Sequence, residues 1–333
     1  MTSENRDLTP VAAVPAAQPT AQPAGQLSFT KGHGTENDFV LIDDRHATLD
    51  LTPAMVRELT DRRAGIGADG VIRVVPSAAL DEGAAVLAQD PSAVWFMDYR
   101  NADGSIAQMC GNGVRVFAAY LEDLGLAYFD DGHELALGTR AGVRRVRKEA
   151  NGWFAVDMGV WSFPGGTGAV TDGFDAEVGV RGLEPAGAEI PRPALSVDLG
   201  NPHTVLALAT VADLERADLT HAPRVVPTPP QGTNVELVVP LGEETTVDGS
   251  VVGRVRMRVH ERGVGETRSC GTGACAAALA VRAWAGDGAP DVWLVEVPGG
   301  TVRVTMLTDG HVELAGPAEL VADGQLRSPV RGA

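Results

Sequence analysis

The chain has 333 residues, 44% of them hydrophobic, and a formal net charge of −17 at pH 7. This length suggests about two domains, each able to bury a core. The negative charge argues against binding to nucleic acid or to anionic membranes, and no apolar run reaches the roughly 18 residues of a membrane span.

Cysteine and lysine are both rare in this chain. The cysteines are Cys110, Cys270 and Cys275, and the lysines are Lys31 and Lys148. Such a small, odd set of cysteines is not typical of a disulfide framework and suits a reducing compartment, so we expect a cytoplasmic protein. The N-terminus lacks the charged and apolar segments of a secretory signal. A pyridoxal Schiff base would need one of the two lysines.

The N-terminal segment differs in composition from the rest of the chain. Residues 1–26 are rich in Ala, Pro, Gln and Thr without an apolar period, which predicts a disordered tail. Strands are expected at 27–29 and 39–43, on either side of a glycine-rich turn that contains Asn37 and Asp38.

A literal G-x-G-x-x-G motif occupies residues 65–70. In dinucleotide-binding proteins this motif follows a strand and opens a helix. Here it follows a predicted helix, which Thr52 and Pro53 begin, and it precedes a predicted strand at 71–75. We therefore interpret the motif as a helix-to-strand turn.

The remaining sequence alternates between predicted strands and loops. Residues 76–93 are acidic and alanine-rich with little periodicity and predict an inserted loop, whereas 164–193 predict a linker rich in Gly, Pro and Asp. Asn151-Gly152 predicts a hairpin turn. Further strands are expected at 95–99, 195–199, 232–239, 251–259, 292–297, 301–306, 311–314 and 319–321.

Each half of the chain contains strands, a cysteine-glycine turn, one helix and further strands. We therefore expect an α+β fold of two pseudo-symmetric domains, each a mainly antiparallel sheet wrapped around a central helix. The N-terminal domain is predicted to comprise 27–158 plus 318–333 and to carry Cys110. The C-terminal domain is predicted to comprise 159–317 and to carry Cys270.

The two cysteine-glycine turns have matching sequences. Cys110-Gly111-Asn112-Gly113 and Cys270-Gly271-Thr272-Gly273 each precede a helical pattern. Each cysteine should stand at a helix N-terminus, where free N–H groups and the helix dipole favour an anion and lower the pKa of a thiol. We interpret the pair as facing each other across one small-molecule site. Cys275 lies inside the second helix and is most simply a core residue.

Three other interpretations of the cysteines were weighed. A zinc site needs three or four closely spaced ligands, but Cys270 and Cys275 are too far apart and Val264 replaces the second histidine of H-E-x-x-H. No metal is therefore expected. A cysteine hydrolase with His203 as its base leaves the second turn without a role. The third interpretation is that both cysteines are simply small buried residues beside tight turns.

Two thiols on opposite sides of a carbon atom suit one reaction particularly well. One thiolate removes a proton from one face of the carbon, and the other thiol returns a proton to the opposite face. Because the α-proton of an amino acid is weakly acidic, the site must stabilise a carbanion-like transition state. Helix N-termini aimed at the α-carboxylate can do so.

Four segments together resemble the diaminopimelate epimerase family. They are Lys31–Phe39, Asn101–Gly113, Gly200–His203 and Glu261–Cys275. The resemblance extends from about residue 27 to the end of the chain. It implies an isomerase without a cofactor that interconverts LL- and meso-2,6-diaminopimelate, in lysine and peptidoglycan precursor biosynthesis. It also implies a homodimer.

The resemblance also assigns roles to individual residues. Cys110 and Cys270 would be base and acid, and His203 and Glu261 would tune their thiols. Backbone N–H groups of Gly111, Asn112, Gly271 and Thr272 would bind the reacting carboxylate. The remaining substrate contacts would come from Asn37, Asn101, Asn201, Asn234, Glu261 and Arg262, of which the arginine suits a bidentate carboxylate contact.

The sequence departs from the family at Gly70, where relatives often have a substrate-binding glutamine. One polar contact is thus absent or is made by backbone or water. The tail and the 76–93 segment are also additional. Two alternatives stay open, namely a proline or hydroxyproline racemase of the same fold, and a protein that binds amino acids without catalysis.

Overall fold

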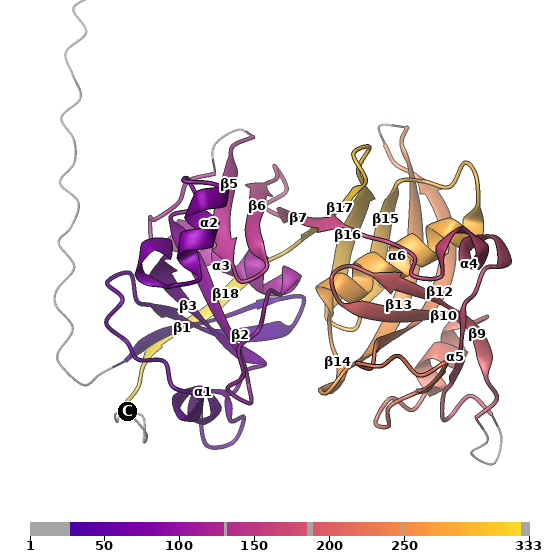
Figure 1. Ribbon diagram of the computed structural model, residues 1–333, viewed down its shortest axis with the longest axis horizontal. Coiled ribbons are helices and arrows are strands. Elements are labelled where there is room, and N and C mark those ends of the chain that lie inside the picture. The colour runs from indigo at the N-terminus through magenta and orange to yellow at the C-terminus, as the bar shows by residue number, and fades with distance from the viewer. Residues whose placement is uncertain (1–26, 130–131, 185–188, 248, 328–333) are drawn as a thin grey trace, which may run out of the picture.

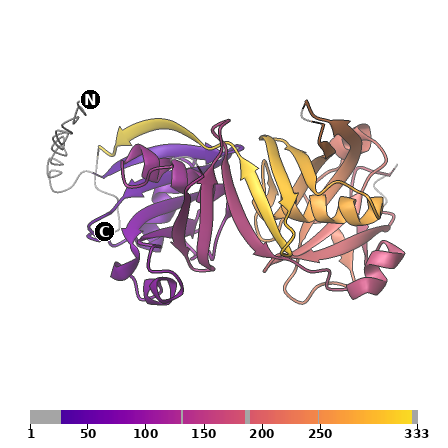
Figure 2. The same cartoon turned by 90° about the horizontal axis from the view of Figure 1, so that it is seen from above.

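The computed structural model describes residues 27–129, 132–184, 189–247 and 249–327. The predicted tail, residues 1–26, lies outside the described residues. The chain forms two lobes that lie side by side and are joined at the middle by strands (Figures 1 and 2).

The first lobe is built from the early part of the chain and from its last strand. Its strands are β1 (Ser28–Gly34), β2 (Asn37–Asp43), β3 (Gly70–Pro76), β4 (Trp95–Asn101), β5 (Glu134–Thr139), β6 (Gly142–Lys148), β7 (Phe154–Val160) and β18 (Glu319–Gln325). Its helices are α1 (Pro53–Thr60), the 3-10 helix η1 (Ser77–Ala79), α2 (Gly83–Gln89) and α3 (Gly111–Asp123).

The second lobe contains the rest of the chain. Its strands are β8 (Ala176–Gly179), β9 (Arg192–Asp198), β10 (Pro202–Ala207), β11 (Arg224–Val226), β12 (Asn234–Thr245), β13 (Val251–Glu261), β14 (Gly265–Thr267), β15 (Val292–Val297), β16 (Gly300–Met306) and β17 (His311–Gly316). Its helices are α4 (Gly166–Asp172), α5 (Val211–Arg216) and α6 (Gly271–Ala285).

Both lobes wrap a sheet around one central helix. In the first lobe the strands follow the order β18-β1-β2-β3-β4-β5-β6-β7 around α3, with parallel pairing only at β2–β3 and β4–β5 among the described strands. In the second the order is β17-β16-β15-β13-β12-β10-β9 around α6, with parallel pairing at β13–β15 and β10–β12. The predicted α+β fold of two domains with mainly antiparallel sheets is confirmed.

The two sheets are continuous through the pairing of β7 with β17. β17 then leads to β18, which returns to the first lobe and pairs with β1 (Figure 1). The predicted domain boundary at 158/159 lies inside β7, and the one at 317/318 lies between β17 and β18. Both boundaries stay predictions. Residues 328–333 of the predicted N-terminal domain lie outside the described part of the chain.

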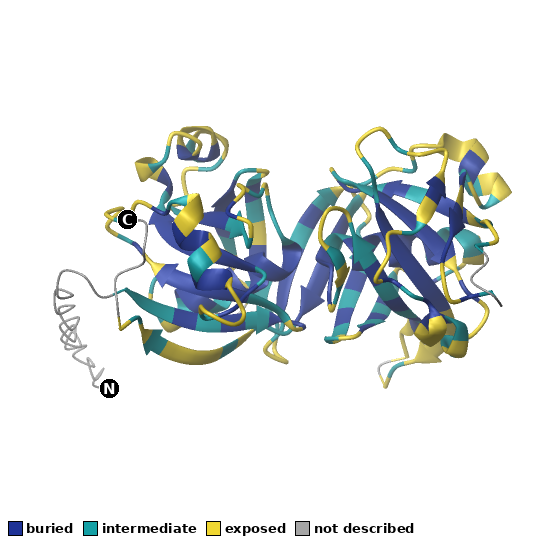
Figure 3. Ribbon diagram, turned by 90° about the horizontal axis from the view of Figure 1, so that it is seen from below, coloured by how far each residue is buried: buried dark blue, intermediate teal, exposed yellow. Residues whose placement is uncertain are grey.

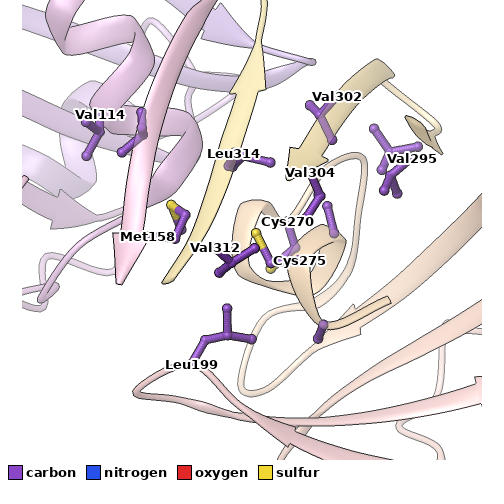
Figure 4. Close-up of a cluster of buried hydrophobic side chains, with 14 of the residues drawn as sticks. Val114, Met158, Leu199, Cys270, Cys275, Val295, Val302, Val304, Val312 and Leu314 are labelled. Atoms are coloured by element: carbon purple, nitrogen blue, oxygen red, sulfur yellow. The ribbon is translucent and has the colours of Figure 1, made fainter. Parts of the chain in front are cut away.

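A single apolar core extends through both lobes. Val114, Phe117 and Leu121 of α3 are fully buried, at the spacing of one helix face. α6 is buried nearly all round because its alanines allow the sheet to approach closely. Met158 of β7 and Leu314 of β17 lie between the two helices (Figure 4). Buried positions accordingly run along the strands of both lobes and across the junction (Figure 3).

Two predicted irregular segments contain regular structure. Residues 76–93, predicted to be a loop, form η1 and α2, and Val86 packs against Phe96 and Ala136. The helix has seven residues, about two turns, and most of its side chains are apolar, so no helical period stands out in the sequence. The predicted linker 164–193 likewise contains α4, β8 and the start of β9.

Helix caps and turns were predicted more accurately from the sequence than these two irregular segments. Thr52 caps α1 by accepting a hydrogen bond from Met55 N at 3.2 Å, as predicted. Residues 65–70 connect α1 to β3, so the interpretation as a helix-to-strand turn is confirmed. Asn151-Gly152 joins β6 to β7, which pair antiparallel.

Candidate active site

Each of the two matching cysteines caps a central helix. Cys110 Sγ accepts a hydrogen bond from Gly113 N at 3.5 Å at the start of α3. Cys270 Sγ accepts one from Gly273 N at 3.4 Å at the start of α6. The predicted position of both cysteines at helix N-termini is confirmed. Sulfur here satisfies an N–H group that the helix leaves without a partner.

The two helix N-termini meet at the junction of the lobes. Asn112, in the first turn of α3, donates from Nδ2 to the carbonyl oxygen of Ser269 at 3.2 Å and to its Oγ at 3.1 Å. A Cβ on Gly271 would lie 3.3 Å from Asn112 N. Because Ser269 and Gly271 flank Cys270, and Asn112 is two residues from Cys110, the fold brings both cysteine turns to one place.

Cys110 is half-buried beside the hairpin that joins β1 to β2. Its Sγ lies 3.4 Å from Asn37 Oδ1, which also accepts a hydrogen bond from Asn112 Nδ2 at 3.3 Å. Burial, with a smaller contribution from the nearby Glu261 carboxylate, raises the pKa of the Cys110 thiol to about 11, although N–H groups of Gly113 and Asn112 and the Arg115 guanidinium oppose the rise.

Cys270 is more deeply buried. Its Sγ lies 3.6 Å from Thr272 Oγ1. Burial raises the pKa of the thiol well above its usual range, and the carboxylates of Glu261 and Glu236 add to the effect. The expectation that both thiols have lowered pKa values is thus wrong, because the net shift of each is upward. The N–H groups do lower the pKa, but the loss of hydration outweighs them.

Arg115 is a buried cation beneath the first cysteine turn. The side chain is fully buried, and it bonds to Pro317 O at 3.3 Å and Thr35 Oγ1 at 3.5 Å rather than to a carboxylate. Burial lowers the pKa of Arg115 to about 10, and Cys110 and Cys275 oppose this shift. A positive charge held here favours the thiolate form of Cys110.

His203 belongs to a hydrogen-bonded chain that leads to the second cysteine turn. Its Nδ1 lies 2.7 Å from Glu236 Oε1 and its Nε2 lies 3.2 Å from Asn201 Oδ1. Asn201 Nδ2 donates to Thr272 Oγ1 at 3.3 Å. His203 and Asn201 are therefore brought to the Cys270 turn.

Glu236 is a site residue that the sequence interpretation missed. The carboxylate is fully buried, and its Oε2 has no hydrogen-bond partner among the described residues. Its only signal in the sequence is one acidic residue within the apolar strand that begins at Asn234. Such a residue is seldom buried unless it is paired, and the partner could not be read from the sequence.

Glu261, Asn234 and Arg262 gather where β12 and β13 meet. Thr267 Oγ1 donates to Glu261, and burial raises the pKa of this carboxyl, with the charge of Glu236 adding to the rise. Asn234 Oδ1 accepts from Arg262 N at 2.9 Å. The guanidinium of Arg262 is exposed and donates to Gln231 O at 2.8 Å, away from the cysteines.

Two predicted substrate-binding residues, Asn101 and Gly111, have surroundings unlike those of the polar residues described above. Asn101, the last residue of β4, donates from Nδ2 to Ser105 Oγ at 3.0 Å, and no side-chain hydrogen bond joins it to another predicted site residue among those described. Gly111 packs so closely that a Cβ would lie 2.8 Å from Met158 Cε. The structure thus collects most, but not all, of the predicted side chains.

Neither a metal-binding cluster nor a membrane-spanning helix occurs in the described ranges. These ranges hold no cluster of three or more His, Cys, Asp or Glu residues arranged to bind a metal ion. None of the helices formed by the described residues is long and apolar enough to cross a membrane.

Comparison with known proteins assigns the chain to a family. The model of the diaminopimelate epimerase family matches residues 29–164 and 195–321. The chain belongs to this family. It is 47% identical over 311 residues to the diaminopimelate epimerase of Streptomyces coelicolor, covering 91% of this chain and 96% of that protein. The Corynebacterium glutamicum diaminopimelate epimerase is 46% identical over 310 residues, covering 90% and 98%.

Solved structures with low sequence identity share the fold of this diaminopimelate epimerase family member. A Bacillus anthracis phenazine biosynthesis protein of the PhzF family has a TM-score of 0.58 at 14% identity, covering 90% of this chain and 99% of that one. A hydroxyproline epimerase from Agrobacterium vitis has a TM-score of 0.54 at 14% identity, covering 91% and 93%. At these identities the likeness concerns the fold alone.

Gly70, where the resemblance predicted a departure from the family pattern, lies in a tightly packed part of the sheet. A Cβ on Gly70 would lie 2.5 Å from Arg100 O and 2.6 Å from Tyr99 Cε2 on the paired strand β4. The buried Tyr99 ring, which also packs edge-on against Phe39 with 5.7 Å between centroids, therefore occupies the space of a side chain at position 70. The sequence did not predict the contact between Tyr99 and Gly70, because this contact depends on the register of β3 with β4.

Proposed function

We propose that the chain interconverts LL- and meso-2,6-diaminopimelate by proton transfer at one Cα between Cys110 and Cys270. As a member of the diaminopimelate epimerase family, it is an isomerase. The observation that carries the proposal is the meeting of two helix N-termini, each capped by a cysteine, at the junction of the lobes.

The reaction needs one thiolate and one thiol. The thiolate takes the α-proton, and the electron pair of the broken C–H bond is delocalised into the α-carboxylate. The opposite thiol then donates its proton to the other face of Cα, so the two sulfurs have exchanged protonation states. Backbone N–H groups of Gly111-Asn112 and Gly271-Thr272 stabilise the charge that develops on the carboxylate.

Substrate binding favours the ionised state of a thiol, which burial disfavours. An ammonium group beside the sulfurs supplies positive charge and lowers the pKa of a neighbouring thiol. The buried Oδ1 of Asn112, which has no hydrogen-bond partner in the described part of the chain, can accept a hydrogen bond there. A thiolate therefore forms mainly in the complex.

The polar residues around the cysteines are assigned supporting roles. His203 and Glu261 tune the thiols, with Glu236 holding the His203 ring. The ammonium and distal carboxylate groups are bound by Asn37, Asn101, Asn201, Asn234, Glu261 and Arg262. Asn101 and Arg262 must turn from their present partners, Ser105 and Gln231, to do so.

A stereochemical assay tests this function. The reduced protein is incubated with LL-diaminopimelate without an added cofactor, and the isomers are separated by chiral chromatography. We expect the meso form to accumulate, while L-proline and 4-hydroxyproline stay unchanged. Racemisation of proline would favour the racemase alternative. Binding of diaminopimelate without conversion would favour an amino-acid-binding protein.

We also propose a cytoplasmic homodimer that serves lysine and peptidoglycan precursor biosynthesis. The resemblance to the family supports this assembly, and the three free cysteines suit a reducing compartment. Sedimentation equilibrium should return twice the 34.6 kDa mass of one chain. A mass of one chain at micromolar concentration would contradict the dimer.

A further inference from the structure

The turn at residues 65–70 holds an acidic side chain that the proposed chemistry does not use. Asp69 precedes β3, and its backbone N–H donates to Asp38 O at 2.9 Å, which fixes the turn against the start of β2. The Asp69 carboxylate accepts hydrogen bonds from Asn37 Nδ2 at 2.7 Å, Asp38 N at 3.1 Å and Arg62 Nη2 at 2.7 Å. Hydrogen bonds thus link Asp69 to Cys110 through a single intervening residue, Asn37.

The hydrogen bonds fix which end of the Asn37 amide faces Cys110. A carboxylate only accepts hydrogen bonds, so the NH₂ group of Asn37 must face Asp69. Its Oδ1 consequently faces Cys110 Sγ at 3.4 Å. A second contact supports this orientation of the Asn37 amide. Asn112 Nδ2, which donates to the carbonyl oxygen of Ser269, also donates to Asn37 Oδ1 at 3.3 Å.

The orientation of this amide matters to the cysteine. A carbonyl oxygen accepts a hydrogen bond from the thiol but offers nothing to the thiolate, whereas an NH₂ group in its place would donate to the thiolate. When the thiol has lost its proton, the same oxygen can accept a hydrogen bond from a substrate ammonium group in place of the thiol. Other charged or titratable groups that act on Cys110 are Glu261 of β13, Arg115 of α3 and Tyr99 of β4.

We propose that Asp69 is a positioning residue that holds the Asn37 amide with its carbonyl oxygen toward Cys110 and the substrate's ammonium group. The proposal rests on the proposed function of Cys110 as a catalytic thiol. The proposal assigns a function to the G-x-G-x-x-G turn, because this turn places the Asp69 carboxylate beside Asn37, the first residue of β2.

The alkylation rate of Cys110 as a function of pH tests the proposal. Modification by iodoacetamide is followed by mass spectrometry of the peptide that contains Cys110. In Asp69→Asn the side chain no longer accepts hydrogen bonds at both ends. When its Oδ1 stays on Arg62, its NH₂ group faces Asn37, and the Asn37 amide turns and donates to sulfur. We expect the midpoint of the pH profile to fall by about one unit, which makes alkylation near pH 8 about tenfold faster.

Two controls separate amide orientation from loss of charge. Asp38→Asn removes the same charge from a neighbouring carboxylate that also binds Arg62, yet leaves the Asn37–Asp69 bond, so the midpoint should change little. In an Asn37→Ala background, Asp69→Asn should have no further effect on the midpoint. The proposal is overturned if the midpoint does not fall in Asp69→Asn alone. It is also overturned if the midpoint falls equally in Asp38→Asn, or when Asp69→Asn is added to Asn37→Ala.

The alkylation profile of Cys110 can be interpreted independently of the assay for diaminopimelate conversion. If the natural chain does not convert diaminopimelate, the proposed function fails, while the Cys110 profile still reports whether Asp69 orients the amide. If the chain is active and the profile of Asp69→Asn equals that of the natural chain, the proposed function stands and the role of Asp69 fails.

Discussion

At the scale of single residues, the two cysteines are set apart from the third by their hydrogen bonds. Cys110 and Cys270 each accept a backbone N–H at a helix start, whereas Cys275 lies within α6, fully buried in the apolar core. The same residue type therefore stands in two environments, and we propose a reactive role for the cysteines at helix ends and a packing role for Cys275.

Alanine substitution of each cysteine tests this division. Cys110→Ala and Cys270→Ala should each reduce kcat by about 10³-fold or more, because each removes one of two proton-transfer groups. Cys275→Ala is the matched control, which should keep kcat within a few-fold and lower stability by roughly 1 kcal/mol through the lost sulfur. The measurements are steady-state rates and urea unfolding of all three variants. Natural activity in either of the first two would contradict the roles assigned here.

At the scale of elements, local signals could be predicted and long-range pairings could not. The Cys-Gly-x-Gly turns and the Thr52 cap depend on residues close in sequence, and the structure confirms them. The bond of His203 to Glu236 depends instead on the parallel register of β10 with β12. No pattern within either strand encodes that register, so the sequence predicted His203 without its partner.

The contact between β3 and β4 gives a prediction about Gly70. In Gly70→Ala the new Cβ would lie 2.6 Å from Tyr99 Cε2 and 2.5 Å from Arg100 O, so the strands must shift. We expect a loss of about 1–3 kcal/mol in the free energy of unfolding, the usual cost of overpacking. Urea denaturation followed by circular dichroism measures it.

A glycine with free space is the control for this variant. Gly168 lies in α4, and a Cβ there would meet no atom within 4 Å. Gly168→Ala should leave stability unchanged or raise it by up to about 1 kcal/mol, since alanine favours helix. If Gly70→Ala were as stable as Gly168→Ala, the Tyr99 ring would not occupy the space beside Gly70.

At the scale of the whole molecule, the β1–β2 hairpin ties the lobes together. Its tip, Thr35-Glu36, has φ angles of 51° and 62°, an uncommon conformation for side chains of this kind. Thr35 Oγ1 lies 2.6 Å from Ser269 Oγ, and Glu36 pairs with Arg268 of the second lobe. The next residue along the hairpin is Asn37, so contacts between the lobes also position the amide beside Cys110.

A substitution at Gly299 should disturb this contact. In Gly299→Ala the Cβ would lie 1.9 Å from Thr35 O, which forces the hairpin tip away from the second lobe. A displacement of about 1 Å in a site can cost up to roughly 10²-fold in rate, and we expect kcat to fall by about tenfold or more. Circular dichroism at the assay temperature must show folded protein, as Gly168→Ala should. Unchanged kcat would mean that the tip does not position the site.

The central claim, that two thiols act on opposite faces of Cα, is tested by the position of deuterium early in the reaction. LL-diaminopimelate is incubated in D₂O, the reaction is stopped while little has converted, and both isomers are analysed by mass spectrometry. The thiol that donates has exchanged with solvent, so the meso product should carry deuterium at the inverted Cα while the remaining LL isomer carries none. Deuterium in the recovered LL isomer at the same rate as in the product, or product that retains the original hydrogen, would contradict the claim.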